Sequence, residues 1–336
     1  MSYSGFSGFS GFSGFSGFSG FSGFSGFSGF SGFSGYASAG AGSAHPMVSD
    51  AVNKSRDALF EEVLPASNGK GNWALQWAPE KSWAKPGAFS KVDDFAPALR
   101  KSSITTRQYL YLVELLGQTS FKKSGKNLVV TLGGVSKTLT QPKMVVFQNE
   151  LDEVQSWAHR RDERASEILS QVVPQAPFWA SVLELQPNSN PRTLELVDCC
   201  LSYTMMVVMR FKAAFNCPRP SEYSPNIQPM IAVPGFSAFP SGHATESRAF
   251  AELMLGLTLQ APTSPLGVQL IRQADRIAEN RIVAGLHFPI DGVAGKELAV
   301  FLAAQLLALN VKQAPMFNWL KGKAQDELKA LGFDLP

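Results

Sequence analysis

The residues with the clearest chemical potential lie between positions 212 and 291, in three short clusters surrounded by apolar sequence. The clusters are Lys212 with Arg219 and Pro220, then Pro-Ser-Gly-His at 240–243, then Arg281 with His287 and Asp291. Lysine and arginine carry positive charge, and histidine can give or take a proton near neutral pH. These residue types together predict a site for a small anion.

The first cluster draws its two cations from different local structures. Lys212 closes an apolar run, 201–211, which predicts a buried helix. Arg219 lies beyond the helix end between Pro218 and Pro220, where proline favours extended backbone. The two positive charges can therefore converge on one point.

The second cluster lies where a turn becomes a helix. Ser241 is a favourable N-cap, Gly242 lets backbone approach a ligand, and 244–257 is rich in helix-forming residues. Free backbone N–H groups at a helix start attract anions. His243 is expected at the rim of that site.

The third cluster spans the joint between two predicted helices. Residues 277–284 read as a helix end, Gly285 as its stop and Pro289 as the first turn of the next helix, which leaves His287 between them. Asp291 can hydrogen-bond one ring nitrogen of His287, so that the other is free as a nucleophile or ligand. Phosphate and vanadate, whose charge is spread over several oxygens, would both suit such a site.

In order and spacing, the three clusters resemble the signature of the phosphatidic acid phosphatase type 2 and vanadium-dependent haloperoxidase superfamily. The resemblance covers about residues 194–309 and is specific because three separate spacings agree. One departure is Asn280, where the family usually has serine before the arginine. The resemblance implies a mostly α fold, a helical bundle of the acid phosphatase/vanadium haloperoxidase type.

The resemblance also implies a role for each residue. In the phosphatase branch His287 would attack phosphorus, His243 would protonate the leaving group and Asp291 would orient His287. The phosphate oxygens would be held by Lys212, Arg219, Ser241, Gly242 and Arg281. In the haloperoxidase branch the same residues would hold vanadate as cofactor, with His287 as its axial ligand and His243 assisting peroxide activation.

Two chemistries and one non-enzymatic function remain open. Phe236 resembles an aromatic position near the halide site of fungal chloroperoxidases, although an aromatic residue is also ordinary pocket lining. The chain is short beside typical haloperoxidases and shows no export signal, which favours an acid-phosphatase-like monoester hydrolase without a cofactor, acting through a phosphohistidine. The alternatives are a vanadium-dependent haloperoxidase acting on halide and hydrogen peroxide, and an assembly protein.

The assembly alternative rests on the first 46 residues. A Gly-Phe-Ser repeat runs from Gly5 to Gly35 and is followed by a spacer of small residues, which together predict a disordered low-complexity tail over 1–46. Self-association through 1–36 is one possible role. Beyond the tail we expect an arm over 47–143, with Trp73, Trp77 and Trp83, and a helical catalytic domain over 144–336.

Composition excludes several other classes of protein. The net charge of +3, without consecutive basic residues between aromatics, argues against nucleic-acid binding and leaves a small phosphate ester as the simpler partner. Three cysteines form neither a disulfide framework nor a metal-ligand set. No signal peptide is apparent and no apolar stretch reaches the ~20 residues of a membrane span, so a cytoplasmic protein is expected.

The remaining helices and strands are predicted from the spacing of apolar residues and from the positions of glycine and proline. A hairpin is expected over 128–139, and the charged residues of a long helix over 144–173 are expected to form a solvated face that carries His159. The other helices are expected over 51–64, 105–116, 192–215, 266–284, 290–309 and 317–331. Glu222, Tyr223, Glu246 and Arg248 lie near the clusters but are left out of the predicted site, which should lie at one end of the bundle.

Overall fold

The computed structural model describes residues 92–172, 176–333 and 335. The tail predicted over 1–46, the helix predicted over 51–64 and the three arm tryptophans lie outside the described residues. The described residues belong to one compact unit.

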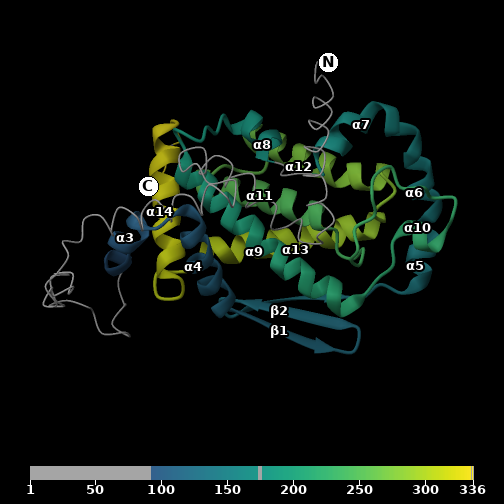
Figure 1. The fold of residues 1–336 in the computed structure, drawn as a ribbon, viewed down its shortest axis with the longest axis horizontal. Coiled ribbons are helices and arrows are strands. Elements are labelled where there is room, and N and C mark those ends of the chain that lie inside the picture. The colour runs from purple at the N-terminus through teal and green to yellow at the C-terminus, as the bar shows by residue number, and fades with distance from the viewer. Residues whose placement is uncertain (1–91, 173–175, 334, 336) are drawn as a thin grey trace, which may run out of the picture. The chain divides into compact units, whose positions relative to one another are not determined.

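Helices make up most of this unit, which confirms the predicted mostly α fold (Figure 1). The first group comprises α3 (Val92–Lys101), α4 (Ile104–Gly117), α5 (Met144–Asn149), α6 (Leu151–Trp157), η2 (Ala158–Arg160), α7 (Arg161–Ser170) and α8 (Ala176–Leu183). The second comprises α9 (Pro191–Phe215), α10 (Pro220–Tyr223), α11 (Gly242–Thr258), α12 (Pro265–Val283), α13 (Pro289–Ala308) and α14 (Pro315–Ala330). The expected helices over 105–116, 192–215, 244–257, 266–284, 290–309 and 317–331 are therefore confirmed to within a few residues.

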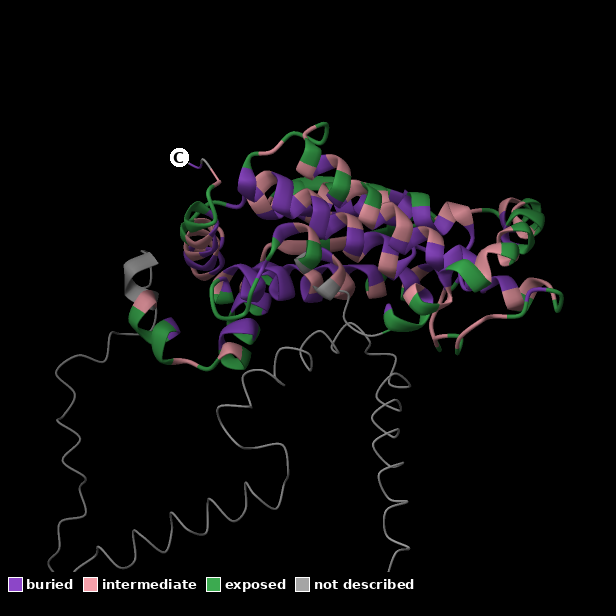
Figure 2. Ribbon diagram, turned by 90° about the horizontal axis from the view of Figure 1, so that it is seen from above, coloured by how far each residue is buried: buried purple, intermediate pink, exposed green. Residues whose placement is uncertain are grey.

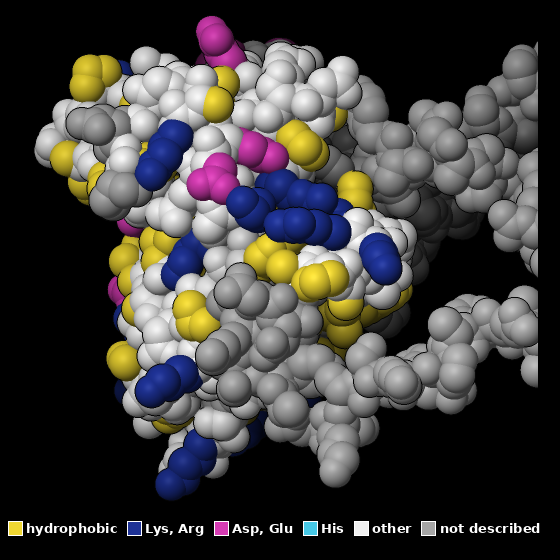
Figure 3. Space-filling model, turned by 90° about the vertical axis from the view of Figure 1, so that its left-hand side faces the viewer, with side chains coloured by type: hydrophobic (Ala, Val, Ile, Leu, Met, Phe, Trp, Pro, Cys, Tyr) yellow, Lys and Arg dark blue, Asp and Glu magenta, His cyan; other side chains and the backbone are white. Residues whose placement is uncertain are grey.

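Helices α9 and α11 form the centre of the bundle. Helix α9 packs against α4, α11 and α14, and α11 also packs against α12 and α13. Most residues of α9 and α11 are buried, as Figure 2 shows along the middle of the bundle, because these helices are apolar on most of their circumference. The face in Figure 3, at the end with α14, mixes basic, acidic and apolar side chains and shows no histidine among its described atoms.

Carboxylates from neighbouring elements cap three of these helices. Glu327 accepts hydrogen bonds from the first backbone N–H groups of α9, at 2.9 and 2.7 Å. Glu114 does the same for α14, at 3.0 and 2.8 Å, and Glu150 accepts one bond from α13 at 3.1 Å. The first N–H groups of a helix have no partner inside it, so each bond fixes a helix start against another element.

A small antiparallel sheet lies beside the bundle. Strands β2 (Asn127–Leu132) and β3 (Val135–Thr140) form the predicted hairpin around Gly133 and Gly134, both of which have positive φ. Strand β1 (Thr119–Ser124), which pairs with β2, was not predicted. Its sequence, TSFKKS, contains a single large apolar residue and so lacks the alternation that indicates a strand.

The long helix predicted over 144–173 is wrong. The segment forms α5, α6, η2 and α7, with a break at Glu150, whose side chain turns away to cap α13. The charged run is also not simply a solvated face. Arg164 is buried and donates to Asn280 of α12, whereas His159 is exposed, as expected.

In the part of the chain that the structure describes, no helix combines the length and the apolar character that crossing a bilayer requires.

Candidate active site

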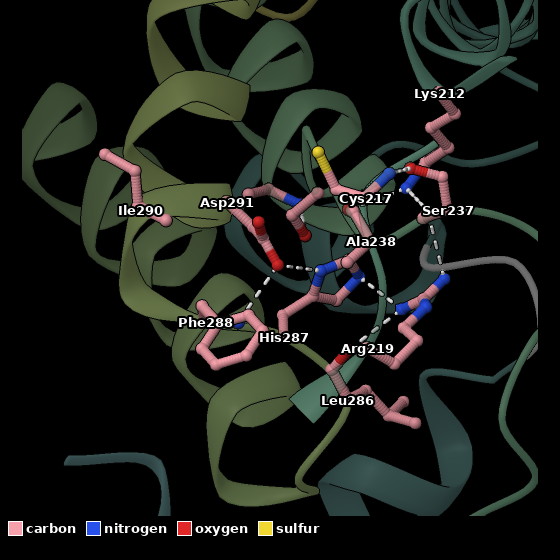
Figure 4. Close-up of polar contacts among 12 residues, drawn as sticks. Lys212, Cys217, Arg219, Ser237, Ala238, Leu286, His287, Phe288, Ile290 and Asp291 are labelled. Carbon is pink, nitrogen blue, oxygen red and sulfur yellow. Dashed lines mark hydrogen bonds and ion pairs between the residues drawn. The ribbon is translucent and has the colours of Figure 1, made fainter. Parts of the chain in front are cut away.

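The three clusters meet at the end of the bundle where α9 and α12 finish and α11 and α13 begin. Figure 4 shows residues of the first and third clusters pointing toward one another. Asn216, in the left-handed conformation, ends α9, and Gly285, with φ of +74°, follows the end of α12. Pro289 is the first residue of α13, so His287 lies in the joint between two helices, as the spacing predicted.

Lys212 is fixed in the last turn of α9 by the loop that precedes α11. Its Nζ donates to the carbonyl oxygens of Ser237 at 2.6 Å and Ala238 at 2.9 Å (Figure 4). The side chain is buried, at 1% exposure. Burial, followed by the nearby charge of Arg219, lowers the pKa of Lys212 well below its usual value.

Arg219 joins this loop to the third cluster. Its Nε and Nη2 donate to the Phe236 carbonyl at 3.2 and 3.0 Å, and Nη1 donates to the Leu286 carbonyl at 2.9 Å. Nη1 also lies 3.0 Å from His287 Nε2. Because guanidinium has no acceptor atom, Nε2 must present its lone pair to Arg219.

The Phe236 ring lies beside both cations. Its centroid is 5.1 Å from Lys212 Nζ and 5.4 Å from Arg219 Cζ, within the range of a cation–π contact. The ring is only partly buried.

His287 and Asp291 form the hydrogen-bonded pair that their spacing suggested. His287 Nδ1 donates to Asp291 Oδ2 at 2.9 Å, and the same oxygen accepts from Phe288 N at 3.0 Å (Figure 4). This bond assigns the hydrogen to Nδ1 and keeps Nε2 unprotonated. Burial, aided by Arg219 and Lys212, lowers the pKa of His287 well below its usual value, whereas burial raises the pKa of Asp291 to about 7.

The second cluster starts α11 and is attached to α13. Ser241 Oγ accepts from Ala244 N at 3.4 Å as an N-cap, and Ser241 N donates to the Asp291 carbonyl at 3.0 Å. His243 Nε2 donates to the backbone carbonyl of Gln171 at 2.8 Å, which leaves its Nδ1 as the unprotonated nitrogen. Burial, followed by the charge of Arg281, lowers the pKa of His243 to about 3.

Arg281 enters from the last turn of α12. Its Nη2 donates to Gln171 Oε1 at 2.9 Å and to the Ile168 carbonyl at 3.2 Å. Its Nε and Nη1 are buried and have no hydrogen-bond partner among the described residues. Buried donors normally have partners, so these two nitrogens mark a place for an acceptor.

The three cations have no carboxylate partner in the part of the chain that the structure describes. Among residues 92–172, 176–333 and 335, no carboxylate lies within ion-pair distance of the side chains of Lys212, Arg219 or Arg281. Burial lowers the pKa of Arg219 and of Arg281 to about 10, so both remain charged at neutral pH. Buried charge is costly without compensation, and an anion among these side chains would supply it.

Four residues near the clusters are not part of the predicted site, and three of them make contacts that a structural role explains. Glu222 accepts from Arg219 N at 2.5 Å, Tyr223 packs against Phe288, and Arg248 pairs with Glu252 on α11. Glu246 has a pKa raised to about 8 by burial, opposed by Lys212.

Asn280, which departs from the usual serine, faces α7 rather than the three cations. It accepts from Arg164 and donates to Glu167 and Gln171, each at 3.0 Å. Gln171 is the residue near the site that was not predicted. Gln171 contacts His243 and Arg281, which lie about 70 and 110 positions away in the sequence, and no local sequence pattern predicts these contacts.

Comparison with known proteins gives one family and a partial structural likeness. Residues 196–314 match the PAP2 superfamily. A solved structure titled as the first bacterial vanadium-dependent iodoperoxidase is similar at 16% sequence identity and a TM-score of 0.38. The similarity covers 48% of this chain and 48% of that one, so it spans about half the length of that protein. No curated protein matches the chain.

Proposed function

We propose that the chain, whose residues 196–314 match the PAP2 superfamily, is a phosphoric monoester hydrolase. The proposed substrate is a small-molecule phosphate ester, and the proposed intermediate is a phosphohistidine at His287. The observation that carries the proposal is that Lys212, Arg219 and Arg281 are buried with no ion-pair partner in the described part of the chain, and that Arg219 contacts His287 Nε2. A phosphoryl group has the charge and the several oxygens that such donors can hold.

The first chemical step is attack by His287 on phosphorus. When the substrate phosphoryl group takes the Arg219 Nη1 donor, the Nε2 lone pair is released and forms the nitrogen–phosphorus bond while the bond from phosphorus to the ester oxygen breaks. Asp291 holds the hydrogen on Nδ1 and faces the positive charge that the ring acquires. Lys212, Arg219 and Arg281 balance the charge on the phosphoryl oxygens, and the start of α11 with Ser241 and Gly242 adds donors there.

The leaving oxygen needs a proton, which we assign to His243. This histidine is neutral in the free protein because burial and Arg281 depress its pKa. A bound phosphoryl group opposes the effect of Arg281 and raises the pKa of His243, so that Nδ1 takes up a proton from solvent and then passes it to the leaving oxygen. In the second step His243 takes a proton from water, the water oxygen bonds to phosphorus, and the nitrogen–phosphorus bond breaks to release phosphate.

Steady-state hydrolysis of an aryl phosphate between pH 4 and 8 tests the proposal. The parent should turn over, orthovanadate should inhibit it, and His287→Ala should abolish turnover. His159→Ala is the matched control, because that histidine is exposed and belongs to none of the three clusters, and it should leave turnover unchanged. Equal turnover in the parent and His287→Ala would overturn the proposal.

A second candidate is vanadium-dependent haloperoxidase activity, which the Phe236 ring beside two cations favours. The donor set fits vanadate, because three cations could hold its oxygens and His287 Nε2 could act as ligand. When bound, vanadate would supply the activation of hydrogen peroxide for halide oxidation. Bromide oxidation by peroxide after vanadate loading, lost in His287→Ala, would favour this candidate over the hydrolase.

A further inference from the structure

Gln171 connects two of the proposed site residues. It follows the last residue of α7 and is fully buried, at 0% exposure. Its backbone carbonyl accepts from His243 Nε2 at 2.8 Å, and its side-chain Oε1 accepts from Arg281 Nη2 at 2.9 Å. The same Oε1 accepts from Asn280 Nδ2 at 3.0 Å. One residue thus contacts the proposed proton donor and one of the three cations.

Resting on the proposed function, we infer that Gln171 is a positioning residue whose neutral side-chain oxygen holds Arg281, while its backbone carbonyl accepts from His243. The hydrogen bond from His243 Nε2 leaves Nδ1 as the nitrogen that exchanges protons with the leaving group and water. The bond from Arg281 Nη2 directs the guanidinium while its Nε and Nη1 keep no other partner among the described residues.

The neutrality of the acceptor matters because a carboxylate would form an ion pair with Arg281. Such a pair would offset one of the three charges that attract the substrate phosphate. Helix α7 does carry a carboxylate one turn earlier, at Glu167, but it pairs with Arg276 at 2.5 Å instead. The guanidinium of Arg276 is partly exposed, and that ion pair does not include any of the three buried site cations.

The position of Gln171 is fixed by the contacts of α7 with α12. Arg164 donates to Asn280 at 3.0 Å, and Arg161 donates to the Val283 carbonyl at 3.1 Å. A second acceptor of Arg161 is the Gln228 carbonyl, at 2.6 Å. Helix α7 therefore packs against the last turns of α12, and Gln171 lies at the C-terminal end of α7.

Two substitutions separate positioning from a merely structural role. Gln171→Glu keeps an acceptor for Arg281 and Asn280 but adds charge, and Gln171→Met keeps the approximate volume but removes the acceptor. Glu167→Gln is the matched control, because it changes the charge of α7 one turn away and leaves the three site cations without a new partner. Each protein is compared by its Tm and by calorimetric binding of inorganic phosphate and of orthovanadate.

The inference predicts that Gln171→Glu retains the parent Tm within a few degrees yet binds both anions at least about tenfold more weakly. Gln171→Met should also bind about tenfold more weakly, since Arg281 loses an acceptor that orients it. Glu167→Gln should bind like the parent. If Gln171 has only a structural role, Gln171→Glu should match the parent in both Tm and anion binding, and that result would overturn the inference. Failure of the parent to bind either anion would overturn the proposed function and this inference with it.

Discussion

Replacing Asp291 by asparagine isolates the charge of the His287–Asp291 pair from its geometry. Asp291 Oδ2 accepts two hydrogen bonds, whereas Oδ1 is buried without a partner among the described residues. An asparagine can place its carbonyl oxygen at the Oδ2 position and its NH₂ group at the Oδ1 position. The fold should survive, with a cost of about 1 to 3 kcal/mol for the unpartnered amide.

The magnitude of the catalytic loss follows from the charge that His287 acquires. When Nε2 bonds to phosphorus and Nδ1 keeps its hydrogen, the ring becomes positive beside the carboxylate, 2.9 Å away between Nδ1 and Oδ2. Two charges about 4 Å apart at an effective dielectric constant of about 20 interact by about 4 kcal/mol. Since about 1.4 kcal/mol corresponds to a factor of ten, kcat should fall roughly a thousandfold.

KM should change little, because His287 is neutral when substrate binds and the lost interaction belongs to the transition state. The assay is steady-state hydrolysis of an aryl phosphate at pH 8, above the pKa of about 7 of Asp291, with Tm and vanadate binding measured on the same samples. Asp275→Asn is the control, since Asp275 forms a partly exposed ion pair with Lys296 and should leave kcat within about twofold. A kcat for Asp291→Asn within tenfold of the parent would refute the assigned role of this carboxylate.

Three further predictions concern packing, pH and charge geometry. A Cβ added at Gly295 would lie 2.8 Å from the Ser241 carbonyl oxygen, so Gly295→Ala should displace the start of α11 and lower kcat about 100-fold. The control is Gly322→Ala, which has open space around the added Cβ and should leave kcat unchanged. Burial raises the pKa of Asp198 to about 7, so the folded state holds a proton that the unfolded state loses above about pH 4, and stability should fall as pH rises from about 4 to about 7. Asp198→Asn should therefore raise Tm at pH 8 more than at pH 4, and equal shifts at both pH values would contradict this. Arg219→Lys should lower kcat/KM at least about tenfold and also lower Tm, because one ammonium cannot span the buried acceptors of the guanidinium; an unchanged kcat/KM would show that charge alone suffices.

The sequence predicted the elements that local chemistry specifies. Ser241 as an N-cap, Gly285 past a helix end and Pro289 at a helix start each act within a few residues, so their consequences can be read directly from the chain. The meeting of the three clusters depended on the resemblance to a family, since spacing alone does not place separate helices together. Cluster geometry in the structure brings Arg219, His287 and Asp291 into one hydrogen-bonded chain.

Features that depend on distant contacts could not be predicted in this way. The break at Glu150 lies in sequence with good helix-forming character, and at that break the Glu150 side chain bonds Ile290 N, 140 positions away. Gln171 is ordinary by type, and one of its two functional contacts uses a backbone carbonyl, which any residue would supply. Gly295 likewise is recognisable only once α13 lies against α11, where its missing side chain allows close approach to Ser241.

The most direct test of the central claim is to trap the phosphorylated protein. The parent is mixed with excess aryl phosphate, quenched in alkali within the first turnovers, and digested for mass spectrometry of the peptide that contains His287. We predict phosphate on His287 that is stable in alkali and lost in acid, with more accumulating when His243→Ala slows hydrolysis of the intermediate. Turnover of the substrate without phosphate on His287, or with phosphate on another residue, would contradict the account.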